Sequence, residues 1–124
     1  MTETNPSSPD QNQPRIIYVK SELFSEIESG QKTLELRIAF GSFSNIKAGD
    51  TLEFRKGNNQ SIRVKVRDVR PYSNLSDVLG KEEVNKIAPG LSREEAITES
   101  EKFFKQSDIE KYGLVVIDFE KVLE

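Results

Sequence analysis

The sequence contains no cysteine and no histidine among its 124 residues. The absence of cysteine excludes disulfide bonds, thiolate nucleophiles and cysteine-ligated metals. The absence of histidine removes the commonest general base and the commonest metal ligand, so Ser-His-Asp and Cys-His mechanisms are ruled out. A zinc site would have to consist of carboxylates alone. We therefore expect neither a metal site nor a cofactor.

Long apolar runs are also missing. None approaches the roughly 20 residues that a transmembrane helix needs, and the N-terminus lacks the basic-then-apolar pattern of a secretory signal. We therefore expect a cytoplasmic protein with no membrane partner. Residues 1–14 contain one apolar residue among many prolines, serines, asparagines and glutamines. This composition predicts a disordered tail, followed by one domain over residues 15–124.

Charge is present in both signs but is unevenly distributed. The 18 basic and 21 acidic side chains give a net charge of −3, which argues against a protein that coats nucleic acid over its whole surface. Residues 55–70 hold six basic residues and one acidic residue, whereas residues 92–124 hold five basic and nine acidic residues. A local basic strip can still attract a polyanion, although ordinary solubilising charge explains the same pattern.

Hydrophobic periodicity predicts the order strand, helix, three strands, two helical segments and strand. The expected strands cover residues 16–19, 33–38, 51–55, 62–69 and 112–122, and the expected helices cover residues 21–29, 75–87 and 92–104. No series of βαβ units with glycine-rich turns is present, which disfavours a doubly wound nucleotide-binding fold. We predict an α+β fold: a small, mostly antiparallel β-barrel with flanking helices.

Local signals mark the ends of these elements. Ser21 is the expected N-cap of the first helix, and Gly30 is expected to follow its last turn with a positive φ. Residues 57–59, Gly-Asn-Asn, fit a hairpin turn. The alternation of the fourth strand slips near residues 67–68, which predicts a β-bulge there. Residues 92–95 begin with serine and end with glutamate, the pattern of a capping box.

Several aromatic residues are expected to pack in the interior. Phe40 and Phe43 anchor an ordered loop over residues 39–49 together with Ile46. Phe103 and Phe104 belong to the apolar positions of the last helix. Tyr112 is expected at the start of the last strand as a half-buried core residue.

The most informative segment runs from Gly30 to Arg37. The glycine ends a helix, Lys32 lies in the tight connection, and strand alternation places Glu35 and Arg37 on one face, opposite the expected core leucines. If this face lines a hollow, the three charged residues offer a ligand a fixed cation, a fixed anion and a proton shuttle. An ordinary ion pair on a solvated sheet face is the alternative, although such pairs add only about 0.2–1 kcal/mol.

The fourth strand carries a second set of candidates. Alternation places Arg63, Lys65 and Arg67 on one outward face, where they could track an RNA backbone. The same three charges would also protect an edge strand from unwanted pairing. Arg70 and Tyr72 follow near the strand end and could border the hollow, with the tyrosine stacking on a base. Tyr112 and Gly113 could border it in the same way, as the alternative to a core position for Tyr112.

The pattern Gly30-x-Lys32-x-x-Glu35-x-Arg37 resembles the GxKxxExR motif of the ASCH domain family, a branch of the PUA-like superfamily. Residues 47–50, 69–73 and 112–119 are similar to further segments of the family, in the same order. The resemblance covers about residues 16–122. It implies a PUA-like β-barrel with a cleft beside the helix-to-strand turn, and a role in RNA-related processes.

The resemblance favours recognition of RNA or a modified nucleoside by Lys32, Glu35 and Arg37. We expect a monomer without a cofactor. The alternative is a small hydrolase. In a ribonuclease, the glutamate would be the base, the arginine would bind phosphate and the lysine would supply charge or a proton.

One branch of the family removes the acyl group from N4-acetylcytidine with the motif lysine, a threonine and a later glutamate. Here Glu35 stands at the threonine position, and Glu82 or Glu83 would be a displaced substitute for the glutamate. A protein-interaction domain without a nucleotide ligand is a third class of function.

Overall fold

The computed structural model of the protein describes residues 15–57 and 59–122. In chain order its elements are β1 (Arg15–Tyr18), α2 (Ser21–Ser29), β2 (Leu34–Ile38), the 3-10 helix η1 (Gly41–Ser44), β3 (Thr51–Lys56), β4 (Gln60–Tyr72), α3 (Leu75–Lys81), α4 (Val84–Ile87), α5 (Arg93–Phe103), α6 (Gln106–Tyr112) and β5 (Leu114–Lys121). The predicted tail of residues 1–14 and Asn58 of the predicted hairpin turn lie outside the described residues. Each helix within the described ranges is too short or too polar to cross a bilayer.

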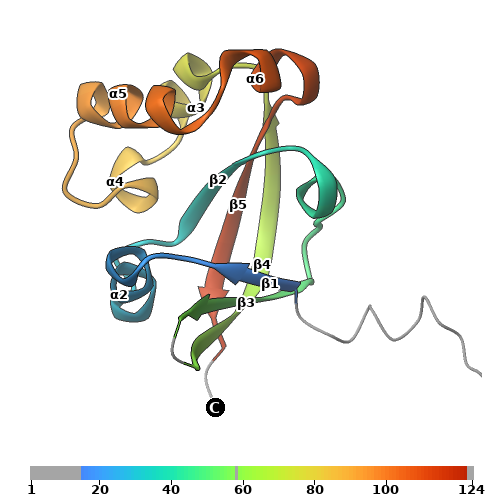
Figure 1. The fold of residues 1–124 in the computed structure, drawn as a ribbon, viewed down its shortest axis with the longest axis vertical. Helices are drawn as coiled ribbons and strands as arrows, with labels where there is room; N and C mark the ends of the chain where they lie inside the picture. Colours follow the sequence, from blue (N-terminus) through green and yellow to red (C-terminus); the bar gives the residue numbers. More distant parts are fainter. Residues whose placement is uncertain (1–14, 58, 123–124) are drawn as a thin grey trace, which may run out of the picture.

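Five strands form one curled, mixed sheet in the order β1-β3-β4-β5-β2 (Figure 1). Strands β1 and β3 pair in parallel, and every other neighbouring pair is antiparallel. Strands β1 and β2 are the two edges of this sheet, so the half-barrel is open between them; we call this opening the seam. The predicted α+β class and mostly antiparallel sheet are confirmed.

Each face of the sheet carries its own hydrophobic cluster. Neighbouring side chains in a strand point to opposite faces, so β5 contributes to both clusters. The inner cluster comprises Ile17, Ile27, Ile46, Leu52, Phe54, Val64, Val66, Val115, Ile117 and Phe119. The outer hydrophobic core comprises Leu34, Leu36, Leu75, Val78, Leu79, Ile87, Ala96, Ile109, Leu114 and Val116. Helices α3 to α6 gather around one end of the sheet, where they cover this outer hydrophobic core (Figure 1).

Most local signals have the expected outcome. The register of β4 against β5 shifts between Val66 and Asp68, which confirms the bulge. Both hydrogen bonds of the capping box at Ser92 are present. Gly30 has a φ of 87°, the left-handed conformation that glycine adopts most easily, and it follows the last residue of α2.

Three expectations need correction at the residue level. The N-cap of α2 is Lys20, and Ser21 is already the first helical residue. Residues 106–112 form an additional helix, α6, so Tyr112 ends a helix and does not begin the last strand. Strand β2 is buried on both faces, because the α3–α6 cap covers its leucines while the curl of the sheet covers Glu35.

The fourth strand lies in the middle of the sheet, between β3 and β5. The interpretation of Arg63, Lys65 and Arg67 as edge protection is therefore wrong, because the backbone of β4 is already paired on both sides.

Gly113 joins α6 to β5. It has a φ of 81°, and a Cβ atom built there would lie 3.3 Å from the carbonyl oxygen of Tyr72. This close approach of two backbones fixes the joint between the helical cap and the sheet.

Candidate functional site

The segment between α2 and β2 lies along the seam. After the turn at Gly30, the backbone N–H of Lys32 donates to the carbonyl of Glu26 at 3.0 Å, which folds the chain back against the helix. The N–H of Thr33 then donates to the carbonyl of Lys86 at 3.1 Å, which attaches the start of β2 to α4. The backbone thus holds the following charged side chains at the junction of the sheet and the helical cap.

Lys32 is buried, with 4% of its surface exposed. Its Nζ donates to the carbonyls of Leu34 and Ile87, both at 2.7 Å. The same nitrogen lies 3.1 Å from Oε1 of Glu35. A lysine ammonium has three N–H donors, so these three acceptors satisfy it. Lys32 therefore ties β2 to α4 and holds the glutamate.

Glu35 is also buried, with 5% of its surface exposed. It is opposite Ile117 in the register with β5, so its side chain is on the inner face of the sheet. Burial alone would raise the pKa of this carboxyl, but the Lys32 ammonium and the Arg37 guanidinium hold it below its usual value. The carboxylate is therefore a permanent anion at neutral pH.

Arg37 is the most exposed of the three, with 24% of its side chain accessible. Its Nε donates to Oε2 of Glu35 at 2.5 Å, and its guanidinium carbon lies 5.0 Å from the ring centroid of Phe43. Neither Nη atom donates to a residue in the described part of the chain. The guanidinium is therefore held in place while its outer donors remain open to a ligand.

The three predicted residues line one cavity of about 370 Å³, which we call the seam cavity. Its walls come from both edges of the half-barrel and from α4 and α5. Tyr18 and Phe103 border it, and each has 70% of its surface exposed. The sequence thus brings a charged trio to a hollow with aromatic walls.

A second cavity of about 370 Å³ adjoins the first and shares Arg37 and Phe104 with it. We call it the aromatic cavity, because it is also lined by Phe40, Phe43 and Tyr112. Sequence reasoning considered Arg37 and Tyr112 of this site but missed the phenylalanines and Asp108. It assigned phenylalanines to the interior, whereas Phe40 is 58% exposed, with its ring centroid 4.6 Å from that of Tyr112.

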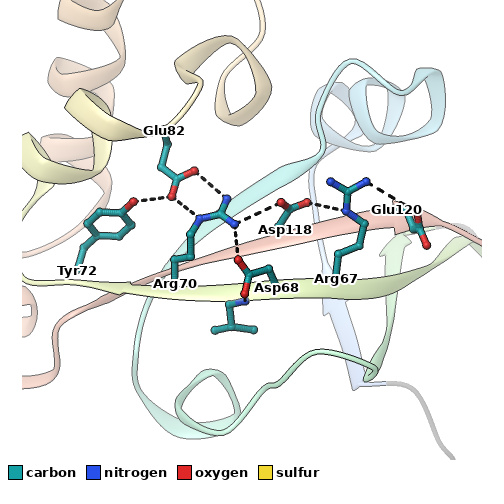
Figure 2. Close-up of polar contacts among 8 residues, drawn as sticks. Arg67, Asp68, Arg70, Tyr72, Glu82, Asp118 and Glu120 are labelled. Atoms are coloured by element: carbon teal, nitrogen blue, oxygen red, sulfur yellow. Dashed lines mark hydrogen bonds and ion pairs between the residues drawn. The ribbon is translucent and has the colours of Figure 1, made fainter.

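Arg70 and Tyr72 line a different cavity, of about 550 Å³, on the outer face. Figure 2 shows Arg70 surrounded by carboxylates. Its Nε and Nη2 donate to the two oxygens of Glu82 at 2.7 and 2.8 Å, and its Nη1 donates to Asp68 at 2.7 Å. The hydroxyl of Tyr72 donates to the same glutamate at 2.6 Å.

We call Arg70, Tyr72, Glu82, Asp68 and Asp118 the outer cluster. Hydrogen bonds from Arg70 and Tyr72 hold the pKa of the Glu82 carboxyl below its usual value. The carboxylates around Arg70 raise the pKa of its guanidinium further. Because Glu82 is committed to this cluster, it does not line the seam cavity beside Lys32.

Arg63, Lys65 and Arg67 are exposed on β4, on the outer face of the sheet. Arg63 lies 3.4 Å from Glu53, and Arg67 lies 3.3 Å from Asp118. Figure 2 shows Arg67 beside the outer cluster, whereas Arg37 is on the inner face. The structure therefore separates the basic strip from the seam cavity. In residues 15–57 and 59–122, no three acidic side chains converge as a metal site would require.

Comparisons with known proteins agree with this architecture. The family model described as "ASCH domain" matches residues 17–123. The crystal structure of hypothetical protein PH0355 is 30% identical, with a TM-score of 0.79, and the match covers 89% of this chain and all of that one. The solution structure of PF0455 from Pyrococcus furiosus is 27% identical, with a TM-score of 0.74, and the match covers 90% and 100% of the two chains.

A more distant structure shows the fold alone. The crystal structure of a mutant of ZmASCH from Zymomonas mobilis is 13% identical, with a TM-score of 0.59, and the match covers 85% of this chain and 67% of that one. No curated protein matches the sequence.

Proposed function

Because this chain belongs to the ASCH domain family, a family suggested to bind RNA, we propose that it binds single-stranded RNA in the seam cavity and the adjoining aromatic cavity. The observation that carries the proposal is the position of Arg37. Arg37 lines both cavities, Glu35 holds its guanidinium, and its Nη donors remain open. An arginine fork of this kind pairs with two oxygens of a phosphate.

The exposed aromatic rings support a single-stranded ligand. Tyr18 and Phe103 border one side of Arg37, and Phe40 and Tyr112 border the other. Proteins recognise single-stranded RNA by stacking splayed bases on aromatic side chains, and each stacked base contributes about 1–3 kcal/mol. A phosphate on Arg37 would leave the two neighbouring bases close to these rings.

Lys32 and Glu35 act as positioning residues in this proposal. The lysine ammonium already has three buried acceptors, so it has no remaining N–H donor for a ligand. The lowered pKa of Glu35 makes its carboxylate a weaker base. These two observations favour binding over a hydrolytic mechanism that needs either group to exchange a proton.

Arg63, Lys65 and Arg67 would have a secondary role. Their charges are exposed on β4, so they would attract the RNA backbone without reading its sequence. Nearby carboxylates on β3 and β5 partly neutralise them, which keeps this contribution small.

Fluorescence anisotropy with a labelled single-stranded RNA decamer of mixed sequence tests the proposal. Replacing Arg37 with alanine is expected to weaken binding about tenfold or more, since a hydrogen-bonded charge contributes about 1.5–3 kcal/mol. Arg93→Ala is the matched control. It removes the same charge from an exposed position at the start of α5, away from both cavities. We expect this variant to bind within about twofold of the wild type.

Several outcomes contradict the proposal. Non-saturable binding, or equal losses in the two variants, would show that the cavities do not hold RNA. The same mixtures are analysed on a denaturing gel. RNA cleavage that disappears in Glu35→Gln would instead support the ribonuclease alternative. Binding of a protein partner that survives Lys32→Ala combined with Arg37→Ala would support the interaction-domain alternative.

A further inference from the structure

The aromatic cavity contains two opposite charges that do not neutralise each other. Arg37 and Asp108 both line it, but no ion pair of 4.0 Å or less joins them. Asp108 lies in the first turn of α6 and is half-buried. Its carboxylate accepts no hydrogen bond from a side chain or backbone group within the described ranges. A partly desolvated anion among aromatic rings is stabilised by any ligand that brings N–H donors.

The two charges present complementary requirements to a flat ligand. Arg37 supplies the outer N–H donors of a fork, which pair best with two adjacent acceptors. Asp108 supplies two oxygens, which pair best with two adjacent donors. Phe40 and Tyr112 supply aromatic surface against which a planar ring system can pack. The ligand that satisfies all three requirements is a planar ring with paired acceptors on one edge and paired donors on the next.

We propose that the aromatic cavity selects guanine, with Asp108 as its specificity-determining residue. Guanine carries acceptors O6 and N7 side by side, the pair that an arginine fork reads. Its N1–H and 2-amino groups form a pair of adjacent donors that a carboxylate can accept together. Adenine, cytosine and uracil each have only one hydrogen-bond donor group on a ring edge. With any of these bases, one oxygen of Asp108 would remain without a hydrogen-bond partner.

This inference rests on the proposed function and specifies which base the RNA presents to the cavity. The seam cavity, on the other side of Arg37, would hold the neighbouring nucleotide. A single guanosine in a run of uridines is therefore sufficient for recognition.

The test uses labelled uridine hexanucleotides with guanosine, adenosine, cytidine or inosine at the third position, measured by fluorescence anisotropy. Inosine lacks only the 2-amino group of guanosine. We expect guanosine to bind about tenfold more tightly than the other three. Asp108→Asn should reduce the guanosine preference to within about twofold, because the amide replaces one of the two accepting oxygens with a donor.

Glu110→Gln is the matched control. It makes the same change in charge two residues along α6, on an exposed side chain that accepts from Gln106 at 3.2 Å. It should keep the guanosine preference. Hexanucleotides that all bind equally well, or a preference that persists in Asp108→Asn, overturn this inference and leave the proposed function intact. Failure of every hexanucleotide to bind overturns both.

Discussion

The seam cavity and the outer cluster each contain an arginine held by carboxylates, yet the two arginines differ in which of their N–H donors remain available to a ligand. Arg70 uses Nε, Nη1 and Nη2 on Glu82 and Asp68. Arg37 uses only Nε within the described structure and keeps both Nη atoms open. The first arrangement connects the α3–α4 segment to β4, and the second presents a donor fork to a cavity.

This difference shows how a scaffold cluster is distinguished from a ligand site. The larger cavity lies beside the outer cluster, and carboxylates of that cluster occupy donors of Arg70 and Tyr72. Lys81 and Lys86 also line it, so free donors alone do not separate the two cavities. We place the ligand at Arg37 because a buried carboxylate holds this arginine, while it lines two adjoining cavities with its Nη atoms open.

The largest expected effect comes from Lys32→Met. This change leaves two buried carbonyls and the Glu35 carboxylate without the ammonium that joins them. Removing one partner of a buried ion pair is expected to lower the free energy of unfolding by about 3–5 kcal/mol. Urea denaturation measures it. A loss below about 1 kcal/mol would contradict the role of Lys32 as the tie between β2 and α4.

Arg70→Ala is expected to have the next largest effect. The variant leaves Glu82 with only the hydroxyl of Tyr72, which should lower the free energy of unfolding by about 2 kcal/mol. RNA affinity should stay within about twofold of the wild type, because the outer cluster lines a separate cavity. A loss of affinity as large as that of Arg37→Ala would remove the distinction between the two arginines.

Lowering the pH is expected to reduce the stability that the Glu35 and Glu82 carboxylates contribute in the two regions. The loss should be smaller than that in Arg70→Ala, since a protonated carboxyl still accepts hydrogen bonds. Glu35 and Glu82 both have pKa values below their usual 4.5 in the folded state. Their stabilisation is therefore present above pH 4.5 and lost as the pH falls through the lower folded-state values. We expect the urea concentration at the unfolding midpoint to decrease as the pH is lowered below 4.5. This decrease should be less steep in Glu82→Gln. A midpoint that rises on acidification would reverse the assigned direction.

The smallest effect is expected from Ser92→Ala. Ser92 accepts from the N–H of Glu95 at 3.1 Å in the capping box of α5. Loss of such a cap lowers stability by about 1 kcal/mol. Helix α5 contributes Phe103 to the seam cavity but no residue to the cavity beside the outer cluster. Calorimetry should show the shift, and RNA affinity is expected to change by less than about twofold.

The sequence predicts the fold better than the site, because local sequence patterns are enough to locate the strands and the helix caps. Alternation in β4 locates the bulge, and the serine–glutamate pattern locates the start of α5. The convergence of Lys32, Glu35 and Arg37 on one cavity follows from their spacing. The spacing does not predict that Lys32 is a positioning residue, because this depends on its hydrogen bond to the carbonyl of Ile87, which is distant in the sequence.

The basic strip and the aromatic rings illustrate where local reasoning fails. Whether Arg63 lies on an edge depends on strand order, which no local alternation specifies. Phe103 has the spacing of a core residue but is 70% exposed, since the outer hydrophobic core includes Ala96 and packs against Ile97 and Phe104 but does not include Phe103. Arg70 and Tyr72 are close to the motif along the sheet, yet they face the outer side of it.

Gly113 has a consequence for redesign of this protein. It has a φ of 81°, and a Cβ atom there would lie 3.3 Å from the carbonyl oxygen of Tyr72, so a side chain between α6 and β5 would strain the backbone and crowd β4. An engineered cap with different helices, and thus a different ligand preference, could be transplanted onto this half-barrel as long as its last residue before β5 remains a glycine.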